Sequence, residues 1–285
     1  MMFRDFIEEL NQNNWEIHGI QIVKDSKLIH QYGDCITRYP IYSATKSILS
    51  LAVGIAVQEE KMSIDEPVYR YICDIVPDSI TKSKIDILNN LSIKRLLTMS
   101  IPGLPFRPQG DNWLEYSINC LPDDITKNEF QYSNIPAYLT GLAVSRAVGE
   151  HVISYLQPRL FDILEIKEPI YQNCPGGYFY GASGMQLSVE ELGKIGQLCF
   201  NRGMYQGKRV VSEKWLNEAV KKQIECREGG YGFYFWRFDE GYRISGKWGQ
   251  RCIVIPPNNL IITYLSDMEE GSEQVTDAVK KYLIY

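Results

Sequence analysis

The sequence lacks any histidine or cysteine pattern that is typical of a metal site or a disulfide framework. Its three histidines, His18, His30 and His151, lie far apart and form no His-Glu-X-X-His or similar ligand spacing. The seven cysteines are odd in number and never occur as Cys-X-X-Cys. We therefore expect no metal and no other cofactor, and we expect free thiols in a reducing compartment.

The sequence also lacks a long hydrophobic run and a basic cluster. Its longest apolar stretch, residues 48–57, is interrupted by Ser50 and Gly54 and is too short to span a bilayer. Residues 1–10 resemble an amphipathic helix more than a signal peptide, because acids interrupt their apolar side chains. The net charge is −5, without a lysine–arginine patch for nucleic acid. We expect a soluble, cytoplasmic protein without membrane or nucleic-acid partners, although a chain that had lost its leader would look the same.

Two common catalytic signatures are absent. The sequence has no Gly-X-Ser-X-Gly elbow, and Gly181-Ala182-Ser183-Gly184 is only a near match. Residues 241–247 match the start of a phosphate-binding P-loop, but Trp248 replaces the required Ser or Thr and a strand is predicted to follow. These departures exclude the P-loop and the hydrolase elbow.

Strand signals occur at both ends of the chain. Residues 18–23 and 28–32 alternate in character around a polar turn, which predicts a β-hairpin. Four further strands are predicted at 231–238, 242–245, 252–255 and 260–266.

Helical spacing dominates most of the remaining sequence. Residues 63–167 are mostly helical in pattern, with Gly149 as a stop after a helix over 135–148. Ser188 and Glu191 form a capping box at the start of a helix over 188–200. The pattern predicts an α+β fold in which an antiparallel sheet flanked by helices is built from both chain ends. We expect residues 1–62 and 176–285 to form this α/β lobe and residues 63–175 to form an inserted all-helical lobe.

Ser43-Ala44-Thr45-Lys46 is the most informative segment. Residues three apart on a helix share a face, so the Ser43 hydroxyl and the Lys46 amine are expected to meet. An apolar helix follows, and a buried amine tends to lose its proton, which suits it to activate a serine. The same spacing also fits an N-cap serine followed by an exposed lysine. A second Ser-X-X-Lys, at Ser79 and Lys82, lies in a polar stretch that we interpret as solvated surface.

Two further segments suit the same chemistry. Tyr132-Ser133-Asn134 precedes a predicted helix and offers a phenol for proton transfer and an amide for substrate binding. Lys247-Trp248-Gly249 lies between two predicted strands, where a lysine suits an anionic group and glycine permits close approach. Each segment alone also fits an ordinary turn or a solvent-facing lysine.

Taken in order, Ser-X-X-Lys, Tyr-X-Asn and Lys-X-Gly resemble the motifs of the serine β-lactamase and penicillin-binding-protein superfamily, and the class C β-lactamase-related branch is the most similar. Residues 96–100 resemble the "LLTHTSG" segment of that family, residues 130–139 its "F-Y-S-N…Y-L" run and residues 181–188 its "A-G-G-L-x-S/T-S" run. The likeness covers roughly residues 20–262.

The resemblance implies a β-lactamase/transpeptidase-like fold with a cleft between the lobes. It implies a serine hydrolase that cleaves an ester, amide or peptide of a small molecule or peptide substrate through an acyl-enzyme on Ser43. Lys46 and Tyr132 would share the proton transfer, with Tyr132 preferred as base in this branch, and the backbone N–H groups of Ser43 and Gln250 would form the oxyanion hole. The substrate-binding residues that it implies are Asn134, Lys247, Trp248, Gly249 and Gln250.

The departures from the family motifs leave alternatives open. Trp248 replaces a threonine that helps to bind a carboxylate, and Gln250 stands where a small hydroxyl residue is common. Efficient penicillin hydrolysis is therefore not expected, although a true β-lactamase, a D-alanyl-D-alanine carboxypeptidase and a catalytically weak binding or sensing module remain alternatives. Trp113, Trp236 and Trp248 would either line a hydrophobic pocket or pack in the core.

Overall fold

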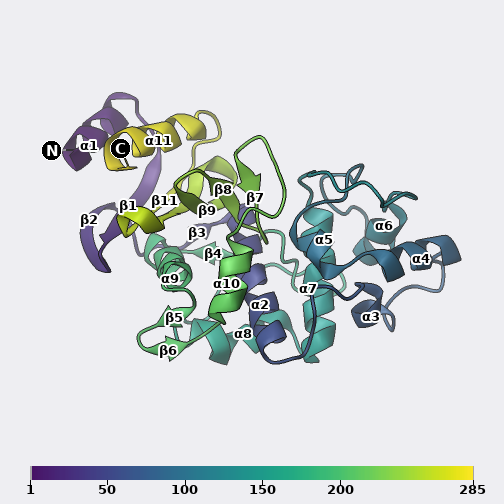
Figure 1. Cartoon of the computed structure of the whole chain (residues 1–285). Helices are drawn as coiled ribbons and strands as arrows, with labels where there is room; N and C mark the ends of the chain where they lie inside the picture. Colours follow the sequence, from purple (N-terminus) through teal and green to yellow (C-terminus); the bar gives the residue numbers. More distant parts are fainter. Residues whose placement is uncertain (1, 285) are drawn as a thin grey trace.

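A seven-stranded antiparallel sheet lies at the centre of the computed structural model, which describes residues 2–284. The strand order is β2-β1-β11-β10-β9-β8-β7, so the N-terminal hairpin lies beside the C-terminal strand β11 (Figure 1). Both chain ends therefore build one sheet, as the sequence predicts. The strands are β1 (Ile17–Lys24), β2 (Lys27–Gly33), β7 (Gly230–Tyr231), β8 (Trp236–Phe238), β9 (Gly241–Gly246), β10 (Gln250–Ile255) and β11 (Leu260–Ser266).

Helices cover both faces of the sheet, so the central strands β10 and β11 are buried along their whole length. On one face, side chains such as Ile20, Ile262 and Tyr264 form a core cluster with residues of α1 (Met2–Gln12) and α11 (Ser272–Val279). The other face packs against α9 (Val189–Phe200), whose start has the predicted capping box.

The helical region between the two parts of the sheet is organised around α2 (Thr45–Gln58) and α7 (Asn134–Val148). Both helices are buried over most of their length and lie in contact with each other. Gly149 ends α7 in the left-handed conformation, with φ 77°, as predicted. The smaller helices α3 to α6 lie on the side of the molecule away from the sheet (Figure 1). The remaining helices are α3 (Tyr69–Ile72), α4 (Lys82–Asn90), α5 (Ile93–Leu97), α6 (Trp113–Asn119), α8 (Val152–Leu156) and α10 (Glu213–Ala219).

One predicted strand is wrong. Residues 231–238 do not form a continuous strand but the short strands β7 and β8, with a turn between them. The turn dips toward α10: Phe233 N–H donates to the Ala219 carbonyl at 2.8 Å, and a Cβ on Gly232 would lie 2.1 Å from that same oxygen. The aromatic side chains of this turn fill the core, so an apolar run that resembles a buried strand is in fact a packed turn.

Within residues 2–284 no helix is both long and apolar enough to cross a membrane. The expected division into lobes at residues 62/63 and 175/176 stays a prediction.

Candidate active site

Ser43 lies in a short 3-10 turn, η1 (Tyr42–Ala44), directly before α2. Ala44, not Ser43, is the N-cap residue of α2. The alternative of a capping serine is therefore wrong, and the Ser43 hydroxyl is left for other partners. Tyr42 has φ 47°, a left-handed conformation that is costly for a large side chain and is often found beside functional residues.

The amine of Lys46 contacts the Ser43 hydroxyl, as the spacing predicts. Lys46 Nζ lies 3.1 Å from Ser43 Oγ, 2.7 Å from Asn134 Oδ1 and 2.7 Å from the Ala182 carbonyl oxygen. Lys46 is only 1 % exposed, so the alternative of an exposed lysine is wrong. Burial holds the pKa of the Lys46 amine well below its ordinary value, because desolvation disfavours the charged form.

Asn134 joins the nucleophile to the helical region. It is the first residue of α7 and is 6 % exposed. Its Oδ1 accepts from Lys46, and its Nδ2 donates to the hydroxyl of Tyr180 at 3.0 Å. Both ends of this amide are thus engaged within the protein, and the residue holds the lysine in place.

Main-chain groups of residues 103–105 fix the segment around Tyr132 by binding the side chains on either side of it. Gln131 accepts from the Gly103 N–H at 2.6 Å and donates to the Leu104 carbonyl at 2.7 Å. Ser133 caps α7 and donates to the Pro105 carbonyl at 2.7 Å. Residues 131 and 133 therefore clamp Tyr132 on both sides.

Tyr132 faces Ser43 and Lys46 from this clamped loop. Lys46 Nζ lies 4.9 Å from the centroid of the Tyr132 ring, and the ring stacks on Trp236 with centroids 5.5 Å apart. Burial raises the pKa of the Tyr132 phenol to about 12, although a hydrogen bond with Ser43 opposes the shift. At neutral pH this phenol keeps its proton.

The end of β9 packs against the Ser43 turn. A Cβ on Gly246 would lie 2.2 Å from the Ile41 carbonyl oxygen, so only glycine allows this approach. Lys247 follows in the short turn η3 (Lys247–Gly249), is exposed, and places its Nζ 4.1 Å from the centroid of the Trp248 ring. Trp248 and Gly249 both have positive φ values, 61° and 86°.

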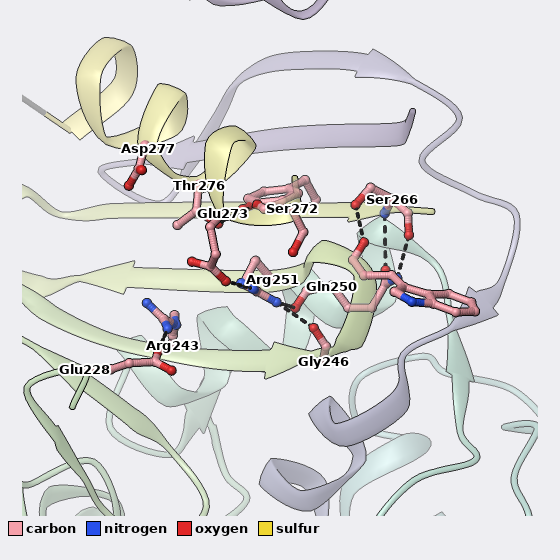
Figure 2. Close-up of polar contacts among 12 residues, drawn as sticks. Glu228, Arg243, Gly246, Gln250, Arg251, Ser266, Ser272, Glu273, Thr276 and Asp277 are labelled. Atoms are coloured by element: carbon pink, nitrogen blue, oxygen red, sulfur yellow. Dashed lines mark hydrogen bonds and ion pairs between the residues drawn. The ribbon is translucent and has the colours of Figure 1, made fainter. Parts of the chain in front are cut away.

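The Gln250 side chain belongs to the sheet. Its Nε2 donates to the Ser266 carbonyl at 2.6 Å, and its Oε1 accepts from the Ser266 N–H at 3.2 Å (Figure 2). Within the described part of the chain, Trp248, Gly249 and Gln250 are not among the residues that line the cleft.

A single cleft of about 1010 Å³ brings most of the predicted residues together. Ser43, Tyr132, Asn134 and Lys247 line it, and Lys46 lies behind Ser43 and Asn134. Trp113 and Trp236 also line it. These two tryptophans line the cleft and also pack against the hydrophobic core, so both alternatives hold for them.

Sequence reasoning missed the charged side of this cleft. Arg243, Arg251, Glu228 and Glu273 line it, and each arginine pairs with one glutamate (Figure 2). The signal for Arg243 was its place on β9, on the same face as Ser245 and four residues before Lys247 of the η3 turn. Arg251 could be assigned to the cleft only from the pairing of β10 with β9, which places Arg251 opposite Ser245.

Comparison with known proteins accounts for this geometry. The "Beta-lactamase" family model matches residues 34–283. The chain belongs to the β-lactamase family. Its antiparallel sheet with flanking helices is that family's fold, which confirms the fold that the sequence predicts.

Three relatives illustrate how far the likeness of this β-lactamase family member extends. A 6-aminohexanoate-dimer hydrolase of Paenarthrobacter ureafaciens is 20% identical over 206 residues, which are 64% of this chain and 50% of the relative. The match thus spans about half the length of that curated relative. A class C β-lactamase from Rhodobacter sphaeroides has a TM-score of 0.77 at 13% identity, with 100% of this chain and 99% of that chain covered. A penicillin-binding protein from Bacillus halodurans has a TM-score of 0.74 at 15% identity, with 97% and 99% covered.

Proposed function

We propose that this protein is a serine hydrolase that cleaves an ester, amide or peptide bond of a small molecule or peptide through an acyl-enzyme on Ser43. The observation that carries the proposal is the buried Lys46 amine, 3.1 Å from the Ser43 hydroxyl in a cleft. Ser43 Oγ attacks the carbonyl carbon, the leaving group departs with a proton, and water then hydrolyses the acyl-enzyme.

Lys46 is the proton acceptor in this proposal. A neutral amine has two N–H donors and one lone pair. The two donors suit the Asn134 and Ala182 oxygens at 2.7 Å, which leaves the lone pair for the Ser43 O–H. Burial favours this neutral form, because none of the three partners is an anion.

Tyr132 serves as the proton donor to the leaving group. The family resemblance favours Tyr132 as the base, but a phenol with a pKa of about 12 keeps its proton at neutral pH. We therefore assign the first proton transfer to Lys46 and the second to Tyr132, and Lys46 returns its proton through the network as Tyr132 loses its own.

The remaining roles follow the family resemblance. The resemblance gives the backbone N–H groups of Ser43 and Gln250 as oxyanion donors, but Gln250 does not line the cleft, so we keep only the Ser43 N–H in this role. One lost donor of this kind typically costs about 10²–10³ in rate. Lys247 would contact an anionic part of the substrate from the cleft wall. Trp248 and Gly249 would act through the shape of the η3 turn, since they support Lys247 without lining the cleft.

A broad ester or amide hydrolase is favoured over a penicillin-hydrolysing enzyme. Trp248 offers no hydroxyl for a β-lactam carboxylate, and the Gln250 side chain is bound to Ser266. Penicillin hydrolysis and D-alanyl-D-alanine carboxypeptidase activity are for this reason only second candidates.

Covalent labelling tests the proposal. Incubation with a fluorophosphonate probe is expected to add one probe mass to the wild-type chain and none to Ser43→Ala, as measured by intact mass spectrometry. The absence of any adduct with fluorophosphonate, penicillin or an activated ester would favour a binding or sensing module instead. Turnover of nitrocefin at rates comparable to those of a simple ester would instead identify a β-lactamase.

A further inference from the structure

Arg95 of α5 makes three hydrogen bonds, and every acceptor is a main-chain carbonyl. Its guanidinium donates to the carbonyls of Ser100, Ile125 and Lys127, at 2.5 Å for Ser100 and for Lys127. A guanidinium is a rigid fork with five N–H donors, so one side chain can bind two separate segments of the chain. Arg95 therefore joins residue 100 to residues 125–127.

No acid neutralises this guanidinium. Within residues 2–284, Arg95 forms no ion pair, and its Nε–H is buried without a hydrogen-bond partner. Burial lowers the pKa of Arg95, and no neighbouring carboxylate opposes the shift. Because removing a charge from water is costly, an arginine that is held by carbonyl dipoles alone indicates a positional role rather than charge pairing.

The segment that leads to Tyr132 has no main-chain support of its own. In the part of the chain that the structure describes, residues 122–130 belong to no helix or strand and form no hydrogen bond between main-chain groups. Asp124 binds Thr126 within the segment, and Lys84 reaches its start at Asp123. The position of residues 125–127 relative to the rest of the protein therefore depends on Arg95.

The other partner of Arg95 lies at the start of the segment that clamps Tyr132. Ser100 follows Met99, whose carbonyl accepts from the Gln131 N–H at 2.9 Å. Met99 is fully buried and has φ 55°, a left-handed conformation that persists only where the surroundings hold it. Through Ser100, Arg95 holds the segment that carries the clamp, as well as the segment that leads into Tyr132.

We propose that Arg95 is a positioning residue that keeps the Tyr132 phenol within reach of the leaving group. Arg95 acts through the two segments it joins, since within residues 2–284 it does not line the cleft. A proton donor must lie within hydrogen-bond reach of its acceptor, and a shift of about 1 Å in a catalytic group costs up to about 10² in rate. This inference rests on the proposed function, because it concerns the proton donor of that reaction.

The dependence of the rate on the leaving group tests this role. 4-Nitrophenyl pentanoate and ethyl pentanoate share an acyl group, but 4-nitrophenolate leaves as a stable anion whereas ethoxide needs a proton. In Tyr132→Phe the ratio of kcat/KM for the ethyl ester to that for the nitrophenyl ester is expected to fall at least about 10²-fold. Arg95→Lys keeps the charge but loses the fork, and the ratio is expected to fall about tenfold. Arg146→Lys is the control and should leave the ratio unchanged, since Arg146 pairs with Asp74 on the surface.

A purely structural role has a different signature. If Arg95 only stabilises the fold, Arg95→Lys lowers the melting temperature and leaves the ratio at its wild-type value, which would overturn the proposal. Gln131→Leu is the second variant should Arg95→Lys fail to fold, because it removes the side-chain bonds to residues 103 and 104 and opens the clamp that Arg95 supports. The ratio is expected to fall in this variant too. A wild-type ratio in folded Gln131→Leu would count equally against the proposal.

Failure of this proposal differs from failure of the proposed function. If the wild type turns over neither ester and takes up no fluorophosphonate, the function itself is contradicted. If both esters are turned over and the ratio falls in Tyr132→Phe but not in Arg95→Lys, the function stands and Arg95 has no positioning role. An unchanged ratio in Tyr132→Phe would remove the phenol from the reaction and the role of Arg95 with it.

Discussion

The two walls of the cleft treat buried charge in opposite ways. The helical wall, with Ser43, Lys46 and Asn134, surrounds the buried lysine amine with neutral oxygens. The strand wall surrounds Arg243 and Arg251 with carboxylates from Glu228 and Glu273. A lysine can release its proton when it is buried, whereas an arginine cannot.

This difference assigns the proton transfer to the helical wall. A neutral amine beside a hydroxyl can accept a proton, so the helical wall suits catalysis. A permanently charged guanidinium cannot act as a base, so Arg243 and Arg251 do not take part in this step. The residue type that each wall buries therefore indicates which wall carries the catalysis.

The largest expected effect comes from the helical wall. Lys46→Ala is expected to slow acylation by about 10²–10⁴, because the proton acceptor for Ser43 is lost. Burst kinetics with an activated ester measure the acylation rate. Lys82→Ala is the matched control, because Lys82 ends the second Ser-X-X-Lys pattern and is exposed. Equal rates for Lys46→Ala and the wild type would show that the amine has no catalytic role.

The pH dependence should also come from the helical wall. Below the pKa of Lys46 the amine is protonated and cannot accept the Ser43 proton, so kcat/KM is expected to rise about tenfold per pH unit. The rise should level off well below the ordinary pKa of lysine, because burial lowers this pKa. No fall is expected until Tyr132 titrates, at a pKa of about 12.

Kinetics with a neutral ester between about pH 5 and pH 9 measure this profile without titrating the substrate. The arginines stay charged over this range and add no inflection. A rate that falls with increasing pH in this window would contradict a neutral Lys46.

A smaller effect is expected where the two walls meet. Gly246→Ala would place a Cβ 2.2 Å from the Ile41 carbonyl oxygen, which forces the strand away from the Ser43 turn. Displacements of this kind lower kcat/KM by about tenfold or more without removing any catalytic group. Gly176→Ala is the control, because its nearest neighbour would lie at 3.7 Å. Unchanged kcat/KM in Gly246→Ala would mean that the positions of the two walls are not coupled.

Local signals predicted most of the fold. Hairpins, capping boxes and glycine stops depend on neighbouring residues, so β1, β2 and the start of α9 follow from short segments. The turn between β7 and β8 could not be predicted in this way. Its apolar side chains are buried by contacts with α10, which is distant from the strand pattern itself.

The candidate site also has one part that neighbouring residues predict and one part that they do not. Ser43 and Lys46 are three residues apart, so their contact is a local property of the chain. The pairs Arg251–Glu273 and Arg243–Glu228 depend on strand register and on where distant segments end. The motifs therefore indicated the helical wall, whereas the strand wall became visible only in three dimensions.

The clamp on Tyr132 has a practical consequence for engineering. Residues 103–105 hold the tyrosine loop through main-chain groups, while Phe106, Arg107 and Gln109 line the cleft. Main-chain bonds survive most side-chain replacements. A library randomised at these three positions is therefore a direct route to altered selectivity with an undisturbed catalytic centre.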